Sequence, residues 1–439
     1  RESRMGQPTD RSLSGPGTTM ARMLTTVELE TRELEQYRPA VLPGVVEAIR
    51  DDARPLRGAR VLHVNATAYG GGVAEILGSM VPLMRDLGLE ADWNVISGSD
   101  PFFGETKAMH NALQGKPHRW TQEERTLWVE TSRANAQTWE EYDFVVVHDP
   151  QPAPILGVLR ADGRRPGGKW LWRCHIDLTD AQPETWGLLR PYVAEYDGTV
   201  WTMPQYVREG VSEANRFIAP PAIDPLSAKN VTLRPGEADS VLERFSVDPR
   251  RPMVCQVSRF DPWKDPLGVI DAYRIARERY PGLQLVLVGS LAHDDPEGQE
   301  WLQKVLKHRS RDADIHVLTN MDGVGNHEVN AFQEAAKVVI QKSTREGFGL
   351  VVSEGLWKGR PVIGGNCGGI PLQVRDGETG YLVDNSAECG ERLIELLSDE
   401  DTCRRMGAAG REVVREHFLL TRYLHDYVRM FRTLAGLRP

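Results

Sequence analysis

Two glutamates separated by seven residues mark the stretch of this chain that is best suited to bind a ligand. Glu346 stands before a Gly-Phe-Gly turn, and Glu354 falls about one helical turn inside the segment that follows. The apolar run 338–340 before the turn and the amphipathic segment 350–357 after it predict a strand, a glycine turn and a helix. The first turn of a helix has N–H groups without partners and a positive dipole end, which suit sugar hydroxyls or phosphate oxygens. We therefore expect both carboxylates to face one cleft; the alternative is an ordinary helix-terminal carboxylate and a solvated helix residue.

Two cations follow a second predicted strand. The run 253–258 is strand-like and leads directly into Arg259, and Lys264 comes five residues later. A planar guanidinium and an ammonium can stabilise the negative charge that a departing diphosphate gains, without a metal. The alternative is a pair of surface cations near a turn. Their position directly after a strand favours the functional interpretation.

Titratable residues also follow two strand-like runs in the first half of the chain. The run 144–147 leads into His148 and Asp149, and the run 170–174 leads into His175 and, two residues later, Asp177. A single histidine at a strand end is usually a core or turn imidazole. Two such ends in one half of the chain favour a shared cleft.

A glycine loop follows the predicted strand 60–65. It carries the triplet Gly70-Gly71-Gly72 and opens a predicted helix over 73–87. Glycines let the backbone approach a phosphate or a sugar closely, although a plain tight turn would use them too. The loop has neither the lysine of a P-loop nor the spacing of a dinucleotide site. A second glycine loop, 364–371, is expected to shape the cleft wall.

The strand-like runs alternate with helical segments along the chain, which is typical of α/β domains with parallel sheets. Ligands bind such sheets at the carboxyl ends of their strands, where the residues above are found. The Asp-x-Asp sequence 312–314 precedes a strand, so we interpret it as loop charge. The segment 24–53 is predicted to be a helical lead-in, and the proline-rich stretch 216–224 is predicted to be a linker and a hinge.

The Glu-x7-Glu element and the Arg259–Lys264 pair resemble those of retaining glycosyltransferases of the GT-B fold. The stretch Ile223-Asp224-Pro225-Leu226-Ser227-Ala228-Lys229-Asn230 is similar to a segment shared by trehalose glycosyltransferring synthases of glycosyltransferase family 4 and some trehalose phosphorylases. The resemblance implies two Rossmann-like, doubly wound parallel-sheet domains facing each other across a cleft. It implies the following divisions: 23–222 the acceptor domain, 223–418 the donor domain, and 419–439 a helix crossing back to the first domain. Residues 1–22 are rich in Gly, Ser, Thr, Arg and Pro, and this composition predicts a disordered extension.

The resemblance also implies roles for single residues. The four catalytic candidates are Glu346, Arg259, Lys264 and His175. The predicted donor-binding residues are Gly71, Gly72, Arg259, Lys264, Glu346, Gly347, Phe348, Gly349 and Glu354. The weaker candidates, for the acceptor sugar, are His148, Asp149 and Asp177.

The reaction implied is transfer of glucose from UDP- or ADP-glucose to free glucose, with retention, to give α,α-trehalose and NDP. Three alternatives remain open: a trehalose phosphorylase, a family 4 enzyme with another acceptor, and a nucleotide-sugar-binding regulator without turnover. No cofactor is expected for the chemistry and no metal site is predicted. Any stimulation by Mg²⁺ would act through the donor's diphosphate.

Composition limits the partners. The 439 residues carry a formal net charge of −9, which argues against general binding to nucleic acid or anionic membranes. No apolar run has the length that crosses a bilayer. Five scattered cysteines are typical of reduced thiols, so we expect a cytoplasmic protein with small-molecule substrates. A homodimer is the expected assembly.

Overall fold

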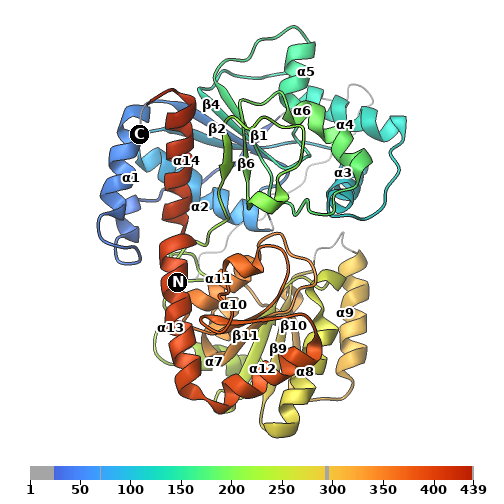
Figure 1. The fold of residues 1–439 in the computed structure, drawn as a ribbon, viewed down its shortest axis with the longest axis vertical. Helices are drawn as coiled ribbons and strands as arrows, with labels where there is room; N and C mark the ends of the chain where they lie inside the picture. The colour runs from blue at the N-terminus through green and yellow to red at the C-terminus, as the bar shows by residue number, and fades with distance from the viewer. Residues whose placement is uncertain (1–23, 70, 292–295, 438–439) are drawn as a thin grey trace, which may run out of the picture.

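The computed structural model describes residues 24–69, 71–291 and 296–437. The predicted extension 1–22 and Gly70 of the glycine loop lie outside these ranges. The described residues form two α/β domains, one above the other in Figure 1, each built on its own sheet. The two doubly wound parallel sheets predicted from the sequence are confirmed.

The sheet of the first domain has seven strands in the order β1-β3-β2-β4-β5-β6-β7. All neighbours are parallel except β1, which pairs antiparallel with β3 at the edge. The strands are β1 (Thr25–Thr26), β2 (Arg60–Asn65), β3 (Glu90–Val95), β4 (Phe144–His148), β5 (Lys169–Arg173), β6 (Gly198–Trp201) and β7 (Arg216–Ile218).

Helices cover both faces of this sheet, because side chains alternate between the faces along each strand. Val61 packs into the core on one face and Leu62 into the core on the other. The first face carries α1 (Val45–Ala53), α2 (Gly72–Asp86) and the last helix, α14 (Leu420–Leu434). The second face carries α3 (Asp100–Leu113), α4 (Gln122–Asn135), α5 (Ile155–Ala161) and α6 (Pro183–Val193).

The sheet of the second domain has six strands, all parallel, in the order β10-β9-β8-β11-β12-β13. They are β8 (Met253–Val257), β9 (Gln284–Gly289), β10 (Ile315–Thr319), β11 (Val338–Gln341), β12 (Val362–Gly365) and β13 (Gly380–Val383). One face carries α7 (Glu237–Arg244), α10 (Asn326–Ala335), α11 (Leu350–Trp357) and α13 (Glu400–His417). The other carries α8 (Pro266–Arg279), α9 (Pro296–Arg309) and α12 (Ser386–Ser398).

Short 3-10 helices occupy several turns. They are η1 (Leu34–Tyr37), η2 (Arg54–Leu56), η3 (Pro204–Tyr206), η4 (Pro262–Lys264), η5 (Asn320–Asp322) and η6 (Ile370–Leu372).

The strand order of each sheet reverses at one point. In the first domain the reversal falls between β2 and β4, and in the second between β8 and β11. Ligands of doubly wound sheets bind in the crevice at such a point, beyond the carboxyl ends of the strands. The loops that leave these four strands carry most of the predicted site residues.

Two local predictions were wrong. The lead-in 24–53 is not helical throughout, because Pro39, Pro43 and Gly44 interrupt it and only α1 is a full helix. Its start instead adds the edge strand β1 to the sheet. Likewise, the predicted linker 216–224 begins with a strand, since Arg216–Ile218 pairs in parallel with β6.

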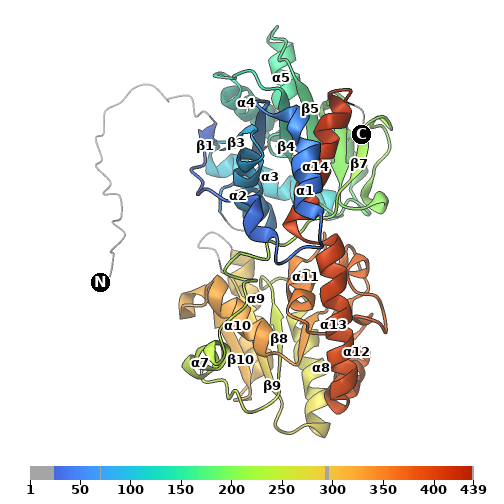
Figure 2. The same cartoon turned by 90° about the vertical axis from the view of Figure 1, so that its left-hand side faces the viewer.

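The chain crosses between the domains twice, and the two crossings touch. Ile223 donates its backbone N–H to Phe418 O (2.9 Å), and Leu420 donates to Ile223 O (2.8 Å). Helices α13 and α14 then run along one side of both domains, as Figure 2 shows. The last helix therefore returns to the first domain.

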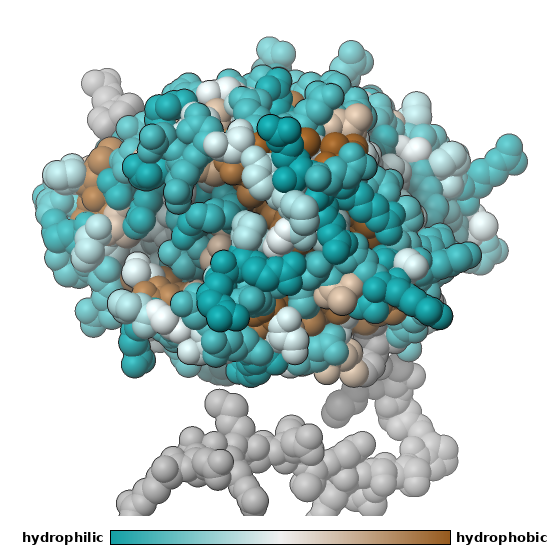
Figure 3. Space-filling view, turned by 90° about the horizontal axis from the view of Figure 1, so that it is seen from below, coloured by the Kyte–Doolittle hydropathy of each residue, from teal (hydrophilic) through white to brown (hydrophobic). Residues whose placement is uncertain are grey.

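Within the described ranges, no helix combines the length and the apolar character needed to cross a bilayer. Figure 3, the view from below, shows a mostly hydrophilic face with hydrophobic residues scattered over it. That face therefore has no broad hydrophobic patch.

Candidate active site

Glu346 lies in the loop between β11 and α11, and among the described residues hydrogen-bond donors contact only one of its carboxylate oxygens. Oε2 accepts hydrogen bonds from Lys264 Nζ (2.5 Å), Ser343 Oγ (3.2 Å) and Gln341 Nε2 (3.3 Å). These contacts fix the carboxylate and leave Oε1 for a ligand. The side chain is 11% exposed, so it is reachable from the cleft.

The helix after this loop begins without a side-chain cap. Gly349 is the N-cap of α11 with φ of 80°, which glycine adopts without strain. A Cβ at Gly349 would lie 3.1 Å from Cγ of Glu346. The predicted turn from Gly347 to Gly349 thus places uncapped amides beside the carboxylate.

The second glycine loop packs against this turn, in the place predicted for it. A Cβ at Gly368 would come within 1.7 Å of Glu346 O, and one at Gly369 within 2.7 Å of the Cα of Phe348. Only glycine allows such an approach, so this loop forms the wall behind the turn.

A helix of the first domain meets the same place. Gly71, with φ of 82°, is the N-cap of α2, which also starts without a side-chain cap. A Cβ at Gly72 would lie 2.6 Å from Cδ1 of Leu350, the first residue of α11. Two uncapped helix N-termini, one from each domain, therefore converge, and both favour anions.

Tyr206 of the first domain, in η3, was not predicted and contacts the Glu346 turn. Its hydroxyl lies 2.9 Å from Gly347 O and 3.1 Å from Glu346 O. The carbonyl of His175 lies 3.1 Å from the position of a Cβ on Gly347. No motif surrounds Tyr206, so this contact could not be predicted from the sequence.

Glu354 is buried inside α11 and faces a cavity of about 290 Å³ between the domains. Its Oε2 accepts from Gln333 Nε2 (3.0 Å). Lys229 lies 3.7 Å from its Oε1 and 2.6 Å from Oε1 of Glu75 in α2. Burial lowers the pKa of Lys229, but Glu354 and Glu75 outweigh burial and raise it. Lys229 belongs to the stretch 223–230 quoted above, but its role could not be read from that stretch.

The two predicted cations differ in how exposed they are to solvent and in their partners. Arg259 is 64% exposed, and its Nη2 lies 3.2 Å from Oδ2 of Asp261. Lys264, at the end of η4, is 15% exposed and is bound to Glu346. A ligand can therefore reach Arg259 freely, whereas it would share Lys264 with Glu346.

The predicted histidines belong to a row of three imidazoles. His63 Nδ1 lies 3.0 Å from Nε2 of His148, and His148 Nδ1 lies 3.0 Å from Nε2 of His175. His148 is 1% exposed with both ring nitrogens engaged, so a direct contact with an acceptor sugar does not fit this geometry. His175, at the cleft end of the row, keeps Nδ1 for a ligand. His63 was not singled out from the sequence.

Asp149 also turns away from the cleft. Its φ is 63°, and its Oδ1 accepts the backbone N–H of His175 (2.8 Å). Burial raises the pKa of Asp149 to about 6, against the opposing effects of that N–H and of Arg173. Asp149 therefore orients His175. Asp177 remains the half-buried acceptor candidate, with Oδ1 accepting from Thr179 N (2.9 Å).

Two groups of residues were considered as metal ligands. Asp312 and Asp314 are bound by Arg277, and Asp314 also by Arg251, in agreement with their interpretation as loop charge. In the described part of the chain, the ligand atoms of Glu105, His118 and Glu124 lie within 4.8 Å of one another. Glu124 also belongs to the capping box of α4, so we assign no ion to this cluster.

Comparisons with known proteins show which sequences this chain resembles. Residues 63–208 match the family model "Trehalose synthase, N-terminal domain", and residues 241–413 match "Glycosyl transferases group 1". Trehalose synthase of Rubrobacter xylanophilus is 48% identical over 419 residues, covering 94% of this chain and 100% of that protein. Trehalose synthase of Thermococcus litoralis is 47% identical, covering 91% and 96%.

More distant matches concern trehalose phosphorylases and the fold. Trehalose phosphorylase of Pleurotus pulmonarius is 28% identical, covering 88% of this chain and 58% of that protein. The α,α-trehalose 6-phosphate synthase of Burkholderia multivorans superposes with a TM-score of 0.69 at 13% identity, covering 86% of this chain and 99% of that one. The chain is thus a glycosyltransferase with the GT-B fold, and it belongs to the trehalose synthase family.

Proposed function

We propose that this enzyme transfers a glucosyl group from UDP- or ADP-glucose to free D-glucose and releases α,α-trehalose and NDP. The observation that carries the proposal is the carboxylate of Glu346, whose Oε2 is bound by Lys264 while its Oε1 remains for a ligand. It lies where two uncapped helix N-termini converge. A nucleotide-sugar presents hydroxyls next to a diphosphate, which is the combination that such a site suits.

Each part of the donor has a partner in this arrangement. Oε1 of Glu346 accepts a hydrogen bond from a hydroxyl of the glucosyl group, and His175 binds the same sugar. The N-termini of α2 and α11, with Arg259 and Lys264, bind the diphosphate. Glu354 accepts from the ribose at the wall of the cavity that it lines.

The proposed reaction proceeds with retention at the face from which the leaving group departs. The bond from C1 to the phosphate oxygen breaks, the acceptor hydroxyl oxygen bonds to C1, and its proton passes to the departing phosphate oxygen. The two cations stabilise the charge on that phosphate. In this scheme Glu346 binds substrate through Oε1 and does not attack C1, while the three donors on its Oε2 hold the carboxylate in place.

Asp177 is the proposed ligand of the acceptor glucose. One of its oxygens is used by the backbone of Thr179, which leaves the other for a sugar hydroxyl. Asp177 follows His175 by two residues, so the acceptor would lie next to the donor glucosyl group. Such positioning supplies much of the rate enhancement of a two-substrate reaction.

Product analysis tests the proposal. The protein is incubated with UDP-glucose or ADP-glucose and free glucose, with phosphate omitted, and Glu346→Gln serves as the blank. Trehalose and NDP in equal amounts are expected, and the faster donor identifies the preferred base. If glucose 1-phosphate forms from trehalose and phosphate instead, the enzyme is a phosphorylase. If neither reaction occurs, the acceptor assignment fails.

A further inference from the structure

We propose that His148 and His63 fix the tautomer of His175, so that His175 offers the proton on Nδ1 to the ligand. This rests on the proposed function in one respect, namely that His175 binds the donor. The three imidazoles form a row from the sheet interior to the cleft: His63 in β2, His148 at the end of β4, and His175 two residues beyond β5.

The pKa values of the three imidazoles determine how many protons their ring nitrogens carry. Burial lowers the pKa of His63 to about 3, and burial together with the Arg173 cation lowers the pKa of His148 and His175. All three rings are therefore neutral near neutral pH, with one N–H each. Each of the two contacts of 3.0 Å needs one donor and one acceptor. Only two arrangements satisfy both contacts.

The far end of the row decides between these arrangements. Nε2 of His63 is buried and has no hydrogen-bond partner among the described residues. It must carry either a bare lone pair or an N–H without an acceptor, and buried orphan N–H groups are the rarer of the two. The proton of His63 is therefore on Nδ1 and is donated to His148 Nε2.

The proton of His148 follows from that choice. Since its Nε2 accepts, its proton is on Nδ1 and is donated to Nε2 of His175. His175 then carries its own proton on Nδ1, the nitrogen that remains for the ligand. The hydrogen bond at one ring nitrogen thereby fixes the protonation of the other. His175 donates to an oxygen of the sugar or the phosphate and does not accept from it.

The row orients a ring and does not conduct protons. A shift of every proton along the row would leave an N–H on Nε2 of His63, which has no acceptor in the part of the chain that the structure describes. The rings of His148 and His175 are also held end to end and nearly in one plane, with centroids 5.3 Å apart and 17° between their planes. Asp149 holds the backbone of His175 independently. His148 and His63 are thus positioning residues.

The chain allows a matched pair of variants at position 148. The amide nitrogen of Asn, a donor, lies as many bonds from Cα as Nδ1 of His, and the amide oxygen of Gln, an acceptor, as many as Nε2. His148→Asn therefore keeps a donor for His175 and loses the contact to His63, whereas His148→Gln does the reverse. Each variant loses one buried hydrogen bond, so similar melting temperatures are expected.

The first measurement needs neither substrate nor catalytically active variants. NMR of the parent protein with isotope-labelled histidine reports which ring nitrogen carries each proton, and the His175→Asn variant assigns the His175 signal. A proton on Nδ1 of His175 is expected. A proton on Nε2 would overturn the proposal, whether or not the protein makes trehalose.

Kinetics with UDP- or ADP-glucose and glucose gives the second readout. His148→Gln should lower kcat by about tenfold or more, as is usual for residues that orient a ligand group, while His148→Asn stays within about threefold of the parent. Equal losses in both variants would mean a purely structural role and would overturn the proposal.

If neither variant folds, His63→Asn and His63→Gln repeat the comparison one ring further away. If the parent makes no trehalose but NMR finds the Nδ1 proton, the proposed function fails and the tautomer assignment stands.

Discussion

The carboxylate of Glu346 is asymmetric, because Lys264, Ser343 and Gln341 all bind one oxygen. This arrangement fixes the direction of the free oxygen before any ligand arrives. A pre-oriented acceptor loses little entropy on binding, which is how enzymes use electrostatic and hydrogen-bonding groups efficiently.

Replacing this carboxylate should abolish transfer without unfolding the protein. Glu346→Gln keeps the size of the side chain but removes the negative charge that pairs with Lys264. We expect kcat to fall by about 100-fold or more, the range for a residue aimed at a reacting group, as measured by NDP release. The control Glu378→Gln changes an exposed glutamate and should leave kcat unaltered. Turnover near that of the parent in Glu346→Gln would remove this residue from the site.

The two cations should differ in what they stabilise. Arg259→Ala and Lys264→Ala should each weaken NDP binding by about tenfold in calorimetry, since each loses a charge-assisted contact. Only Lys264→Ala should also lower the free energy of unfolding, by about 1–3 kcal/mol, because it leaves Glu346 without its cation. Arg259 is mostly exposed, so its loss should not change stability. Unchanged NDP affinity in either variant would contradict the assigned role.

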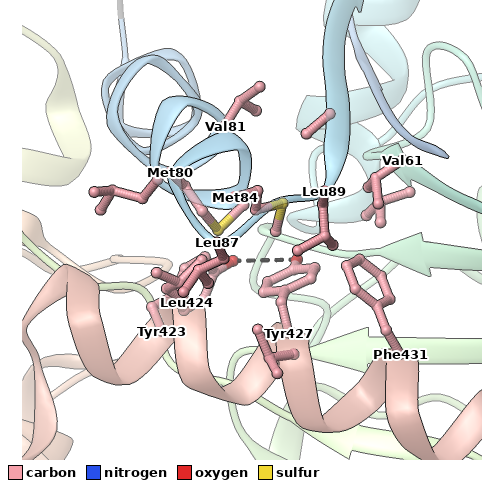
Figure 4. Close-up of a cluster of buried hydrophobic side chains, with 14 of the residues drawn as sticks. Val61, Met80, Val81, Met84, Leu87, Leu89, Tyr423, Leu424, Tyr427 and Phe431 are labelled. Carbon is pink, nitrogen blue, oxygen red and sulfur yellow. Dashed lines mark hydrogen bonds between the residues drawn. The ribbon is translucent and has the colours of Figure 1, made fainter. Parts of the chain in front are cut away.

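At the scale of elements, α14 makes the first domain depend on the end of the chain. Figure 4 shows Tyr423, Leu424, Tyr427 and Phe431 of α14 packed against side chains of α2 such as Met80. The same helix packs over the buried end of the histidine row, with the ring centroid of Tyr427 5.8 Å from that of His63. Helix α14 therefore supports α2, which starts in the site, and the buried end of the histidine row.

Truncating the centre of this contact should destabilise the whole enzyme. Phe431 is fully buried and stacks on Phe144 with ring centroids 4.5 Å apart. Phe431→Ala should lower the free energy of unfolding by about 3–5 kcal/mol in urea titrations, the usual cost of a large cavity in a core. Leu437→Ala, at a partly exposed residue beyond the helix, is the control. A loss below about 1 kcal/mol would show that α14 is dispensable for the first domain.

At the scale of the whole molecule, the two crossings lie next to each other at Ile223 and Leu419, and we predict that they act as a hinge. The domains already touch through Arg345 and Asp180, whose Nη2 and Oδ2 lie 2.8 Å apart, and through Tyr206. Closing two domains on a nucleotide-sugar would exclude water from the reaction.

This hinge is tested in solution. Small-angle scattering of the protein with NDP and glucose should give a smaller radius of gyration than the free protein, because the ligands bridge both domains. NDP alone is the control for effects confined to the second domain. Superimposable profiles in all three conditions would count against hinge motion.

Stability should fall in acid because of the buried histidines. Burial lowers the pKa of His63 from its ordinary value of 6.5 to about 3. Below pH 6.5 the unfolded chain therefore binds a proton at this histidine, whereas the folded chain leaves it unprotonated until about pH 3. The free energy of unfolding decreases as the pH falls through this range. Each such histidine contributes about 1.4 kcal/mol per pH unit in that window. Burial lowers the pKa of His148 and His175 as well.

One carboxylate opposes this trend. The pKa of Asp149 is raised to about 6, so the folded state gains stability from protonating it as the pH falls below 6. This gain offsets about the contribution of one histidine, so the free energy of unfolding still decreases as the pH falls. Urea unfolding between about pH 7 and pH 5 should show it, with a shallower slope in His63→Leu. An unchanged slope in that variant would contradict the assigned pKa of His63.

The sequence by itself determined the two parallel sheets and the loops that carry the site. Strands and helices follow from local periodicity, and the carboxyl ends of parallel strands share one edge, so residues such as Arg259 and Glu346 could be placed together from their position in the chain. The start and end of α11 and the glycine turns were predicted for the same reason.

Only the tertiary structure decided which groups touch. Tyr206 and Gly347 are 141 residues apart, and Lys229 reaches Glu75 across 154 residues. Asp149 and His148 were predicted to face the acceptor, yet packing turned one towards the backbone of His175 and enclosed the other between two imidazoles. Local spacing encodes the geometry of an element, whereas the partner of a side chain depends on how distant elements pack, and a single sequence carries no record of those pairs.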